Sequence, residues 1–259
     1  MQCPHALLRL GAAFLVAMSP ALSHAAAAAA QADELVIDVE DQADPFSRPD
    51  GTGYANDVVR AAYRAMGVNV QFDVVPYARC KANVLGAKVA GCFSMSWEPG
   101  FEGRLVFSQR PLFSVHAVLV ADPGRPMGAK RPQDIQAGTV VGIVNGYEYP
   151  PAVAELASRG VVLEPTGSEE TNLRKLAAGR IDAAVLMVST QPEDSPDRAT
   201  LKGSKRYVPA MTLGVMGSHI GFSVQHPGGD AARRQFDEGL RRIQADGTLA
   251  KISRRWRSP

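Results

Sequence analysis

The sequence predicts an α/β fold of two lobes, each with a mainly parallel sheet covered by helices. Two observations predict this class. Runs of β-branched and aliphatic residues alternate with segments whose apolar residues have helical spacing. This alternation stops at the Pro/Gly-rich residues 122–132 and then begins again with a second set of elements.

The first set begins after a polar linker around Asp33. A loop of turn-forming residues, 41–53, separates the first strand from the first helix, whose apolar residues recur at helical spacing until Gly67 stops it. The predicted strands are 34–40, 68–75 and 89–94, and the predicted helices are 54–66 and 79–87.

The second set follows a strand at 114–121 and the Pro/Gly-rich crossing. Its last helix is opened by Ser168, a capping residue followed by two acidic residues. The predicted strands are 139–146, 161–167 and 180–187, and the predicted helices are 152–160 and 168–179. The final third returns with a strand at 219–225 and two helical pieces, 230–247 and 248–257.

Two crossings of the chain divide it into lobes. We expect lobe one to comprise residues 34–120 and 213–259 and lobe two residues 121–212, with crossings near Ala121-Asp122 and Thr212-Leu213. In open α/β sheets, ligands gather at the carboxyl ends of strands. Two such ends, 94–97 and 146–149, lie in different lobes, so we expect a ligand cleft between them.

The N-terminal residues 1–25 have the pattern of a secretory signal. Arg9 gives a positive start, "LGAAFLVAM" is apolar, and "LSHAAA" offers a small-residue cleavage site. The apolar stretch is too short, and too broken by Pro20, to span a bilayer. We therefore expect an exported, periplasmic protein whose signal is removed. The net charge of +2 gives no reason to expect a nucleic-acid partner.

Export also determines how the three cysteines are interpreted. Cys3 leaves with the signal, so Cys80 and Cys92 remain as a pair in an oxidising compartment. Seven residues of the predicted helix after Cys80 carry the chain down about 10 Å, and three residues of the predicted strand before Cys92 carry it back up by about 10 Å. The two sulfurs then lie at the same level, near the carboxyl end of the strand. A disulfide is the expectation, and two buried free thiols are the alternative. Two cysteines without further ligands make a poor zinc site, and we expect no cofactor.

Five segments in order carry a resemblance to a known family. They are "PFSRPDGTGYANDVVRAAYRAMG", "GCFSMSWEPGFEGRLVFSQRPLF", "RPQDIQAGTVVGIVNGYEY", "LRKLAAGRIDAAVL" and "LRRIQADGTLAKISRRW". The chain resembles the family 3 periplasmic solute-binding proteins, the polar amino-acid type that serves ABC importers. The resemblance implies a two-lobe, type II binding-protein architecture with two hinge crossings. It also implies a small-molecule solute, a membrane permease as partner, and a monomer.

The resemblance implies ligand contacts at particular positions. Ser94 and Ser96 match residues that hydrogen-bond the ligand. Tyr77 matches a residue that makes an apolar contact with it in the first lobe. Tyr147 and Glu148 match a contact at a strand end in the second lobe. Plainer interpretations remain open. The serines would then cap backbone groups, and Tyr77, Trp97 and the tyrosines at 147 and 149 would pack in the core or in turns.

Two positions depart from the family pattern. Amino-acid binders place an arginine for the α-carboxylate where Phe101 stands, and an aspartate for the α-ammonium where Met187 stands. Arg104 lies three residues beyond the arginine position, and Arg79 is the other available anchor. An unpaired buried charge costs several kcal/mol. We therefore predict an aromatic, heterocyclic or modestly charged solute that is not a standard amino acid, with Trp97 or Phe101 able to face a cation.

Three other functions remain as alternatives. Cyclohexadienyl dehydratases share this fold, and Glu148 as acid with Arg79 as anchor would suit such an enzyme. A binding protein that reports to a sensor has no sequence motif to separate it from an importer component. A hydrolase is the weakest alternative, because His116 and His219 lie in strand-like runs and no nucleophile elbow is present.

Overall fold

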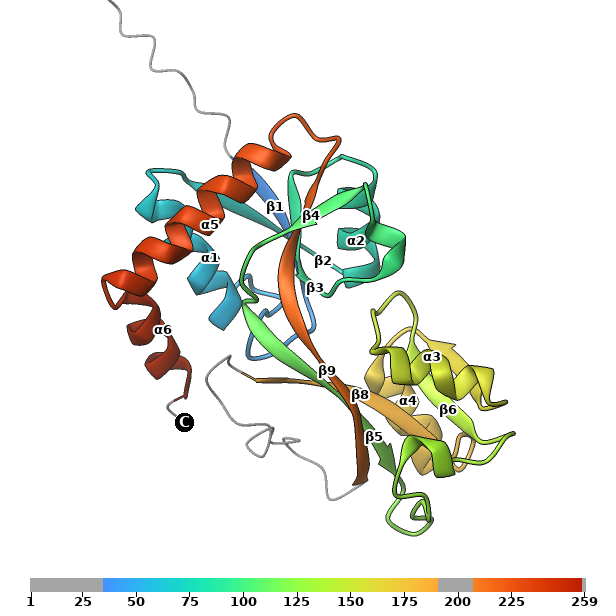
Figure 1. The fold of residues 1–259 in the computed structure, drawn as a ribbon. Helices are drawn as coiled ribbons and strands as arrows, with labels where there is room; N and C mark the ends of the chain where they lie inside the picture. The colour runs from blue at the N-terminus through green and yellow to red at the C-terminus, as the bar shows by residue number, and fades with distance from the viewer. Residues whose placement is uncertain (1–34, 191–206, 258–259) are drawn as a thin grey trace, which may run out of the picture. The chain divides into compact units, whose positions relative to one another are not determined.

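Nine strands form one continuous sheet in the computed structural model, which describes residues 35–190 and 207–257. The strand order is β2-β1-β3-β9-β5-β8-β6-β7, and β4 also pairs with β9 (Figure 1). The predicted signal at residues 1–25 lies outside the described residues. The α/β class predicted from the alternation of strands and helices is confirmed.

The first part of the chain builds one end of the sheet. Strand β1 pairs in parallel with β2 and β3, as two consecutive βα units require. The elements here are β1 (Leu35–Glu40), α1 (Tyr54–Ala65), β2 (Val70–Val75), α2 (Tyr77–Leu85), β3 (Gly91–Met95), η1 (Pro99–Phe101) and β4 (Leu105–Phe107).

Three long strands form the middle of the sheet, and here the parallel prediction is wrong. β5 (Phe113–Ala121) runs antiparallel to both β8 (Ala183–Thr190) and β9 (Val208–Ser223). The residue pattern predicts only residues 219–225 for this last strand. Strand β9 begins at Val208 because its first part pairs along the whole length of β5. The periodicity of a single segment does not show which strand will pair with it.

The second set of elements builds the other end of the sheet. β6 (Val140–Val144) pairs in parallel with β7 (Val162–Thr166) and with β8. Helices α3 (Pro151–Ser158) and α4 (Glu169–Ala177) follow β6 and β7, and η2 (Pro132–Asp134) precedes them. The predicted cap at Ser168 is confirmed, since its hydroxyl accepts a hydrogen bond from the Thr171 amide at 3.2 Å.

The apolar core is divided along the long strands. On β5, Val115 belongs to the core packed against α1, and Ala117 belongs to the core packed against α3. On β9, Leu213 lies in the second core and Ile220 in the first. The division into two lobes therefore falls along the central strands. The boundaries at residues 120–121 and 212–213 stay a prediction.

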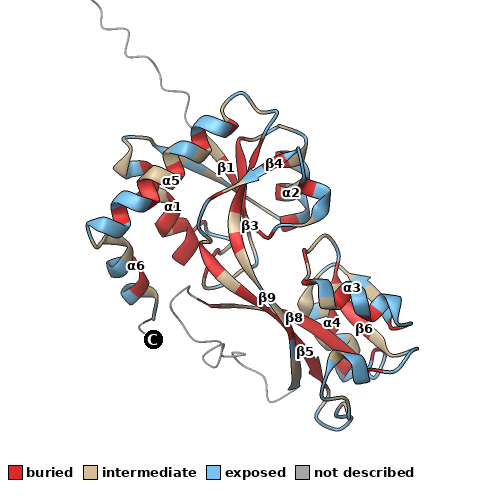
Figure 2. Cartoon of the chain, in the orientation of Figure 1, coloured by how far each residue is buried: buried red, intermediate tan, exposed pale blue. Residues whose placement is uncertain are grey.

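Helices α5 (Gly229–Ala245) and α6 (Thr248–Arg257) return to the first lobe, where they lie beside α1 (Figure 1). Tyr63 donates to the Ala232 carbonyl at 3.1 Å and fixes α1 against α5. Burial is concentrated on the strands and on the helix faces turned to them (Figure 2). Among the described residues, no helix combines the length and apolar character needed to cross a bilayer.

Cys80 and Cys92 form the predicted disulfide, with a Cα–Cα separation of 5.6 Å. The bond joins α2 to β3. Both cysteines are fully buried in a small core with Tyr77, Met95 and Phe101. The cross-link therefore fixes the helix that carries Tyr77 and Lys81 against the strand that carries Ser94.

Candidate functional site

A cavity of about 700 Å³ lies between residues of the two lobes. This size lies within the range of small-molecule sites. Its first-lobe wall comes from the ends of β1 and β3, the loop after β1, the starts of α2 and β5, and the end of α6. Its second-lobe wall comes from the turn after β6, the start of α4, and β8. The lining residues used below are Glu40, Asp44, Phe46, Tyr77, Ser94, Ser96, Phe113, Tyr147, Glu148, Glu169, Met187, Trp256 and Arg257.

Ser94 enters the cavity wall through an irregularity in β3. The register of β3 against β9 shifts between Phe93 and Met95, and Ser94 between them has φ +77°. A bulge of this kind re-aims a side chain, and a positive φ in a serine is an uncommon, strained conformation. The conformation places the Ser94 hydroxyl near the Glu40 carboxylate, whose pKa it lowers. Within the described residues this buried hydroxyl has no hydrogen-bond partner of normal geometry.

Glu40 is the last residue of β1, and its side chain is only 6% exposed. Tyr147, in the turn after β6, donates its hydroxyl to Glu40 Oε1 at 3.1 Å. Burial raises the pKa of Glu40 to about 7, although the hydroxyls of Ser94 and Tyr147 oppose that rise and the nearby Glu169 adds to it. The Glu40–Tyr147 contact joins the two lobes at the cavity.

Glu148 is a second buried carboxylate and the centre of another contact between the lobes. Lys81 on α2 places its Nζ 2.8 Å from Glu148 Oε1, and the Tyr77 hydroxyl donates to Glu148 Oε2. The Ser96 amide also donates to Oε2, at 3.3 Å. Burial raises the pKa of Glu148, and these three donors oppose the rise.

Lys81 makes further contacts at the same junction. Its Nζ lies 2.9 Å from Glu98 and donates to the Gly146 carbonyl at 3.1 Å. Burial lowers the pKa of Lys81, but Glu148 and Glu98 outweigh burial and raise it, so the ammonium stays charged. Lys81 therefore neutralises Glu148.

Glu169 opens helix α4 and lines the second-lobe wall. Its Oε1 accepts a hydrogen bond from the Met187 amide at 2.6 Å, which holds the carboxylate against β8. Burial raises the pKa of Glu169 to about 7, and the Met187 amide opposes the rise. Glu169 also raises the pKa values of Glu40, Tyr147 and Tyr149 through its charge, so it lies close to that group.

Six of the residues predicted at the ligand site line this cavity: Tyr77, Ser94, Ser96, Tyr147, Glu148 and Met187. The serines differ in what they offer. The Ser96 hydroxyl donates to the Gly217 carbonyl at 3.0 Å, as the backbone-capping alternative describes. Met187 contributes its side chain to the wall, and its backbone amide holds Glu169.

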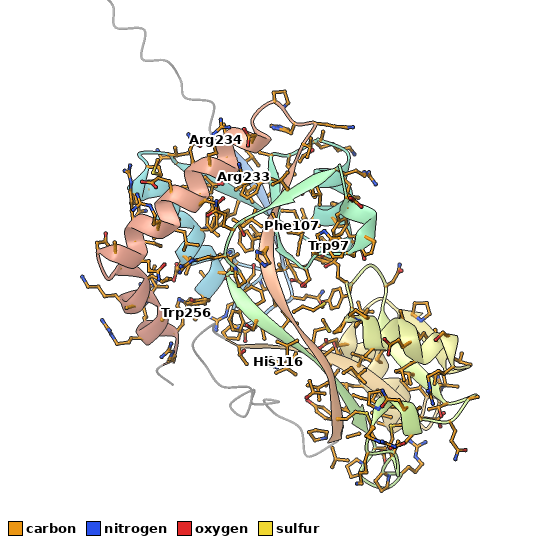
Figure 3. The ribbon with its side chains drawn as sticks, in the orientation of Figure 1. Trp97, Phe107, His116, Arg233, Arg234 and Trp256 are labelled. Carbon is orange, nitrogen blue, oxygen red and sulfur yellow. A yellow bond between two sulfur atoms is a disulfide. The ribbon has the colours of Figure 1, made fainter. Side chains whose placement is uncertain are left out.

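The other four predicted residues lie away from the cavity wall. Trp97 lies in the turn after β3 (Figure 3). It is 60% exposed. Phe101 is buried in the small core around the disulfide, where its ring faces the Lys81 ammonium at 4.9 Å. Arg79 is exposed on α2. Arg104 is exposed and donates to the Leu85 carbonyl at 3.3 Å, so it braces the end of α2.

The placements of Trp97 and Phe101 correct the expectation that their rings line the cleft. The turn through η1 directs Phe101 inward, against the disulfide core, because burying a whole phenyl ring there removes apolar surface from water. Trp97 follows the strand end and points outward.

Sequence reasoning missed Glu40, Glu169 and the loop after β1. Glu40 carried a usable signal, since it is a charged residue at the carboxyl end of a predicted strand. Glu169 was interpreted only as a first-turn acid of a capped helix. The aromatic Phe46, which packs on Phe113 with ring centroids 4.5 Å apart, and Trp256 near the chain end gave no local signal.

The described residues contain no cluster of three or more His, Cys, Asp or Glu side chains suited to a metal ion. His116 bonds Thr190 Oγ1 at 3.0 Å, and burial lowers its pKa. His219 Nδ1 lies 2.9 Å from the Ser108 carbonyl oxygen, to which it donates, so this nitrogen does not activate the neighbouring Ser108 hydroxyl. His219 and Ser108 therefore do not form a nucleophile–base pair through this nitrogen.

The profile of the bacterial extracellular solute-binding proteins, family 3, matches residues 35–259. The chain belongs to this family. The resemblance stated from the five sequence segments is confirmed, and with it the two-lobe, type II binding-protein fold. A small-molecule ligand is what membership of this solute-binding family implies.

Solved structures similar to this family member share its fold at low sequence identity. The arginine-, lysine-, histidine-binding protein ArtJ of Geobacillus stearothermophilus is 16% identical, with a TM-score of 0.69 over 86% of this chain and 95% of that one. An ancestral amino-acid-binding protein, a precursor of cyclohexadienyl dehydratase, is 18% identical, with a TM-score of 0.67 over 86% and 95%. A histidine kinase sensor domain is 20% identical, with a TM-score of 0.68 over 87% and 96%.

Proposed function

We propose that this protein is a periplasmic solute-binding protein that captures a small organic solute between its lobes for an ABC importer. The observation that carries the proposal is the cavity of about 700 Å³, whose walls come from both lobes and which contains buried, directed polar groups. Groups from both walls meet there, Tyr147 with Glu40 and Glu148 with Lys81. A ligand in this position stabilises the closed arrangement of the lobes.

The solute is a molecule other than a standard amino acid. Phe101 and Met187 stand where the amino-acid clamp has its charged residues, and neither supplies a charge. Arg79 and Arg104 are exposed and do not line the cavity, which supports this part of the proposal. The N-terminal signal pattern at residues 1–25 and the Cys80–Cys92 disulfide support export to an oxidising compartment.

Two alternative functions share the fold. A sensor component is supported by the similarity to a histidine kinase sensor domain. A dehydratase-like enzyme would require cationic side chains to hold a carboxylated substrate, and among the described residues lining the cavity only Arg257 is cationic. Transport or sensing is therefore favoured over catalysis.

The experiment is to express the full chain with its signal, purify the exported protein, and measure bound small molecules by native mass spectrometry. Small-angle scattering before and after ligand removal by refolding then measures compaction. We expect a bound organic molecule and a smaller radius of gyration with it than without it. Exported protein that binds no member of a broad solute panel would overturn the proposal. Conversion of a bound molecule to product would favour the dehydratase alternative.

A further inference from the structure

The charged residues around the cavity are strongly unbalanced in sign. Four carboxylates line it, those of Glu40, Asp44, Glu148 and Glu169, against the single described lining cation Arg257. Two of these four have cationic partners outside the cavity. Asp44 pairs with Arg48, and Glu148 pairs with Lys81. The charge directed into the cavity therefore comes from Glu40 and Glu169.

Within residues 35–190 and 207–257, neither Glu40 nor Glu169 forms an ion pair with a lysine, arginine or histidine. Both are held by neutral donors instead. Tyr147 donates to Glu40 at 3.1 Å, and the Met187 amide donates to Glu169 at 2.6 Å. Glu40 is 6% exposed, and its charge repels that of Glu169. One buried and one half-buried carboxylate that face the same cavity without a counter-charge destabilise the unliganded protein.

We infer that the solute is an organic cation, an amine without a carboxylate, whose ammonium binds between Glu40 of the first lobe and Glu169 of the second. This inference rests on the proposed function and names its substrate class. The ammonium supplies the missing counter-charge, and its three N–H donors match the acceptor oxygens that the two carboxylates present. Because one carboxylate comes from each lobe, binding the ammonium also joins the lobes.

The remaining walls fit the rest of such a molecule. Phe46, Phe113, Tyr147 and Trp256 present aromatic surface to the cavity, and aromatic faces attract cations as well as apolar carbon. A carboxylate on the ligand would lie among acidic side chains. Arg257, the described lining cation, is exposed at the end of α6 and offers no enclosed anion site. An amine is therefore favoured over the amino acid from which it would derive.

The test is isothermal titration calorimetry at pH 8.0 with matched probes. The three pairs are cadaverine with L-lysine, agmatine with L-arginine, and tryptamine with L-tryptophan. 3-Indolepropanoate and indole serve as anionic and neutral probes. The variants are Glu40→Gln, Glu169→Gln and the control Glu170→Gln. Glu170 is the adjacent residue of α4, but it is exposed and pairs with Arg174 at 2.7 Å.

We expect at least one amine to bind tenfold or more tightly than its parent amino acid. Glu40→Gln and Glu169→Gln should each weaken that binding at least tenfold, and Glu170→Gln should change it less than twofold. An amino acid that binds as tightly as its amine, or an amine whose affinity survives both glutamine substitutions, would overturn the inference. Binding of only indole or 3-indolepropanoate would overturn it too, while leaving the proposed function intact.

A second readout needs no ligand. If the two carboxylates are kept for a cation, replacing either with its neutral isostere should raise the melting temperature of the unliganded protein at pH 8.0, and Glu170→Gln should not. A lower melting temperature for both glutamine variants would show that the carboxylates are structural and would overturn the inference. This result decides the matter even where none of the probes binds.

Discussion

Lys81 and Glu148 form an ion pair between the two lobes, with Lys81 Nζ 2.8 Å from Glu148 Oε1. Lys81 lies on α2 of the first lobe, and Glu148 lies in the turn after β6 of the second. The Glu148 side chain is 3% exposed and the Lys81 side chain 17% exposed. Such an enclosed pair contributes little net stability compared with apolar residues, but removing one partner leaves a buried charge.

Lys81→Met should therefore destabilise the protein by about 3–5 kcal/mol at neutral pH, since Glu148 loses its cation. Removing Lys81 also removes the main influence that opposes the rise in the pKa of Glu148, so that folded-state pKa rises further above 4.5. A raised carboxyl pKa costs stability as pH rises through it. Urea unfolding should show a larger loss at pH 8 than at pH 5.

Lys88→Met is the matched control, because Lys88 is exposed just beyond the end of α2. It should change the free energy of unfolding by less than about 0.5 kcal/mol at either pH. Equal losses for the two lysine variants would mean that the Lys81–Glu148 pair has no special role.

The Cys80–Cys92 disulfide closes a loop with a sequence separation of 12 residues. In the chain-entropy description, a loop of this size contributes about 3 kcal/mol by restricting the unfolded chain. Cys80→Ala with Cys92→Ala should lower the free energy of unfolding by that amount, as measured by urea denaturation. Mass spectrometry of the exported wild-type protein after thiol blocking should find neither cysteine alkylated. Two alkylated cysteines would show that the bond is absent in the exported protein.

Local sequence patterns predicted most of the fold, because the helices and parallel strands have their own periodicity. The helix at Tyr54–Ala65 and the cap at Ser168 lie where the residues place them. The antiparallel pairing of β5 with β9 depends on residues about a hundred positions apart, and no pattern within one segment encodes it.

The site was predicted only where it depends on strand ends. Ser94 ends one predicted strand and Tyr147 follows another, and both line the cavity. Whether a ring faces the cavity or the core depends on the turn that carries it. The conformation of η1 turns Phe101 inward, and the bulge at Ser94 brings its hydroxyl to Glu40. Neither turn is specified by residue type alone.

The stability of the unliganded protein should fall as pH rises from about 5 to about 8. Burial raises the folded-state pKa of Glu40 and of Glu169 from 4.5 to about 7. The folded state then holds protons that the unfolded state has released. Stability is greatest below the unfolded pKa and is lost as pH rises through 7. The loss is at most about 3 kcal/mol for each group.

The pH dependence is tested by removing the two carboxyl groups, Glu40 and Glu169, while the groups that face them stay in place. Ser94, Tyr147 and Asp41 act on Glu40, and the Met187 amide acts on Glu169. Glu40→Gln with Glu169→Gln should make the melting temperature fall less steeply between pH 5 and 8, whereas Glu170→Gln should keep the wild-type slope. A wild-type slope in the double variant would assign the pH dependence elsewhere.

Three aromatic substitutions distinguish the cavity wall from the core and the surface. Tyr147 lines the cavity, packs edge-to-face on Tyr77 with centroids 5.5 Å apart, and donates to Glu40. Tyr147→Ala should therefore weaken ligand binding at least tenfold, because it removes aromatic contact and the donor that positions Glu40. Trp97→Ala should change affinity less than twofold, since that ring is 60% exposed outside the cavity. Phe101→Ala should cost about 3–5 kcal/mol of stability and leave the affinity of the folded fraction near the wild-type value.

Calorimetry with the exported protein's own bound molecule, paired with urea unfolding, separates the three effects. A tenfold loss of affinity in Trp97→Ala would show that the turn after β3 moves onto the ligand when it binds.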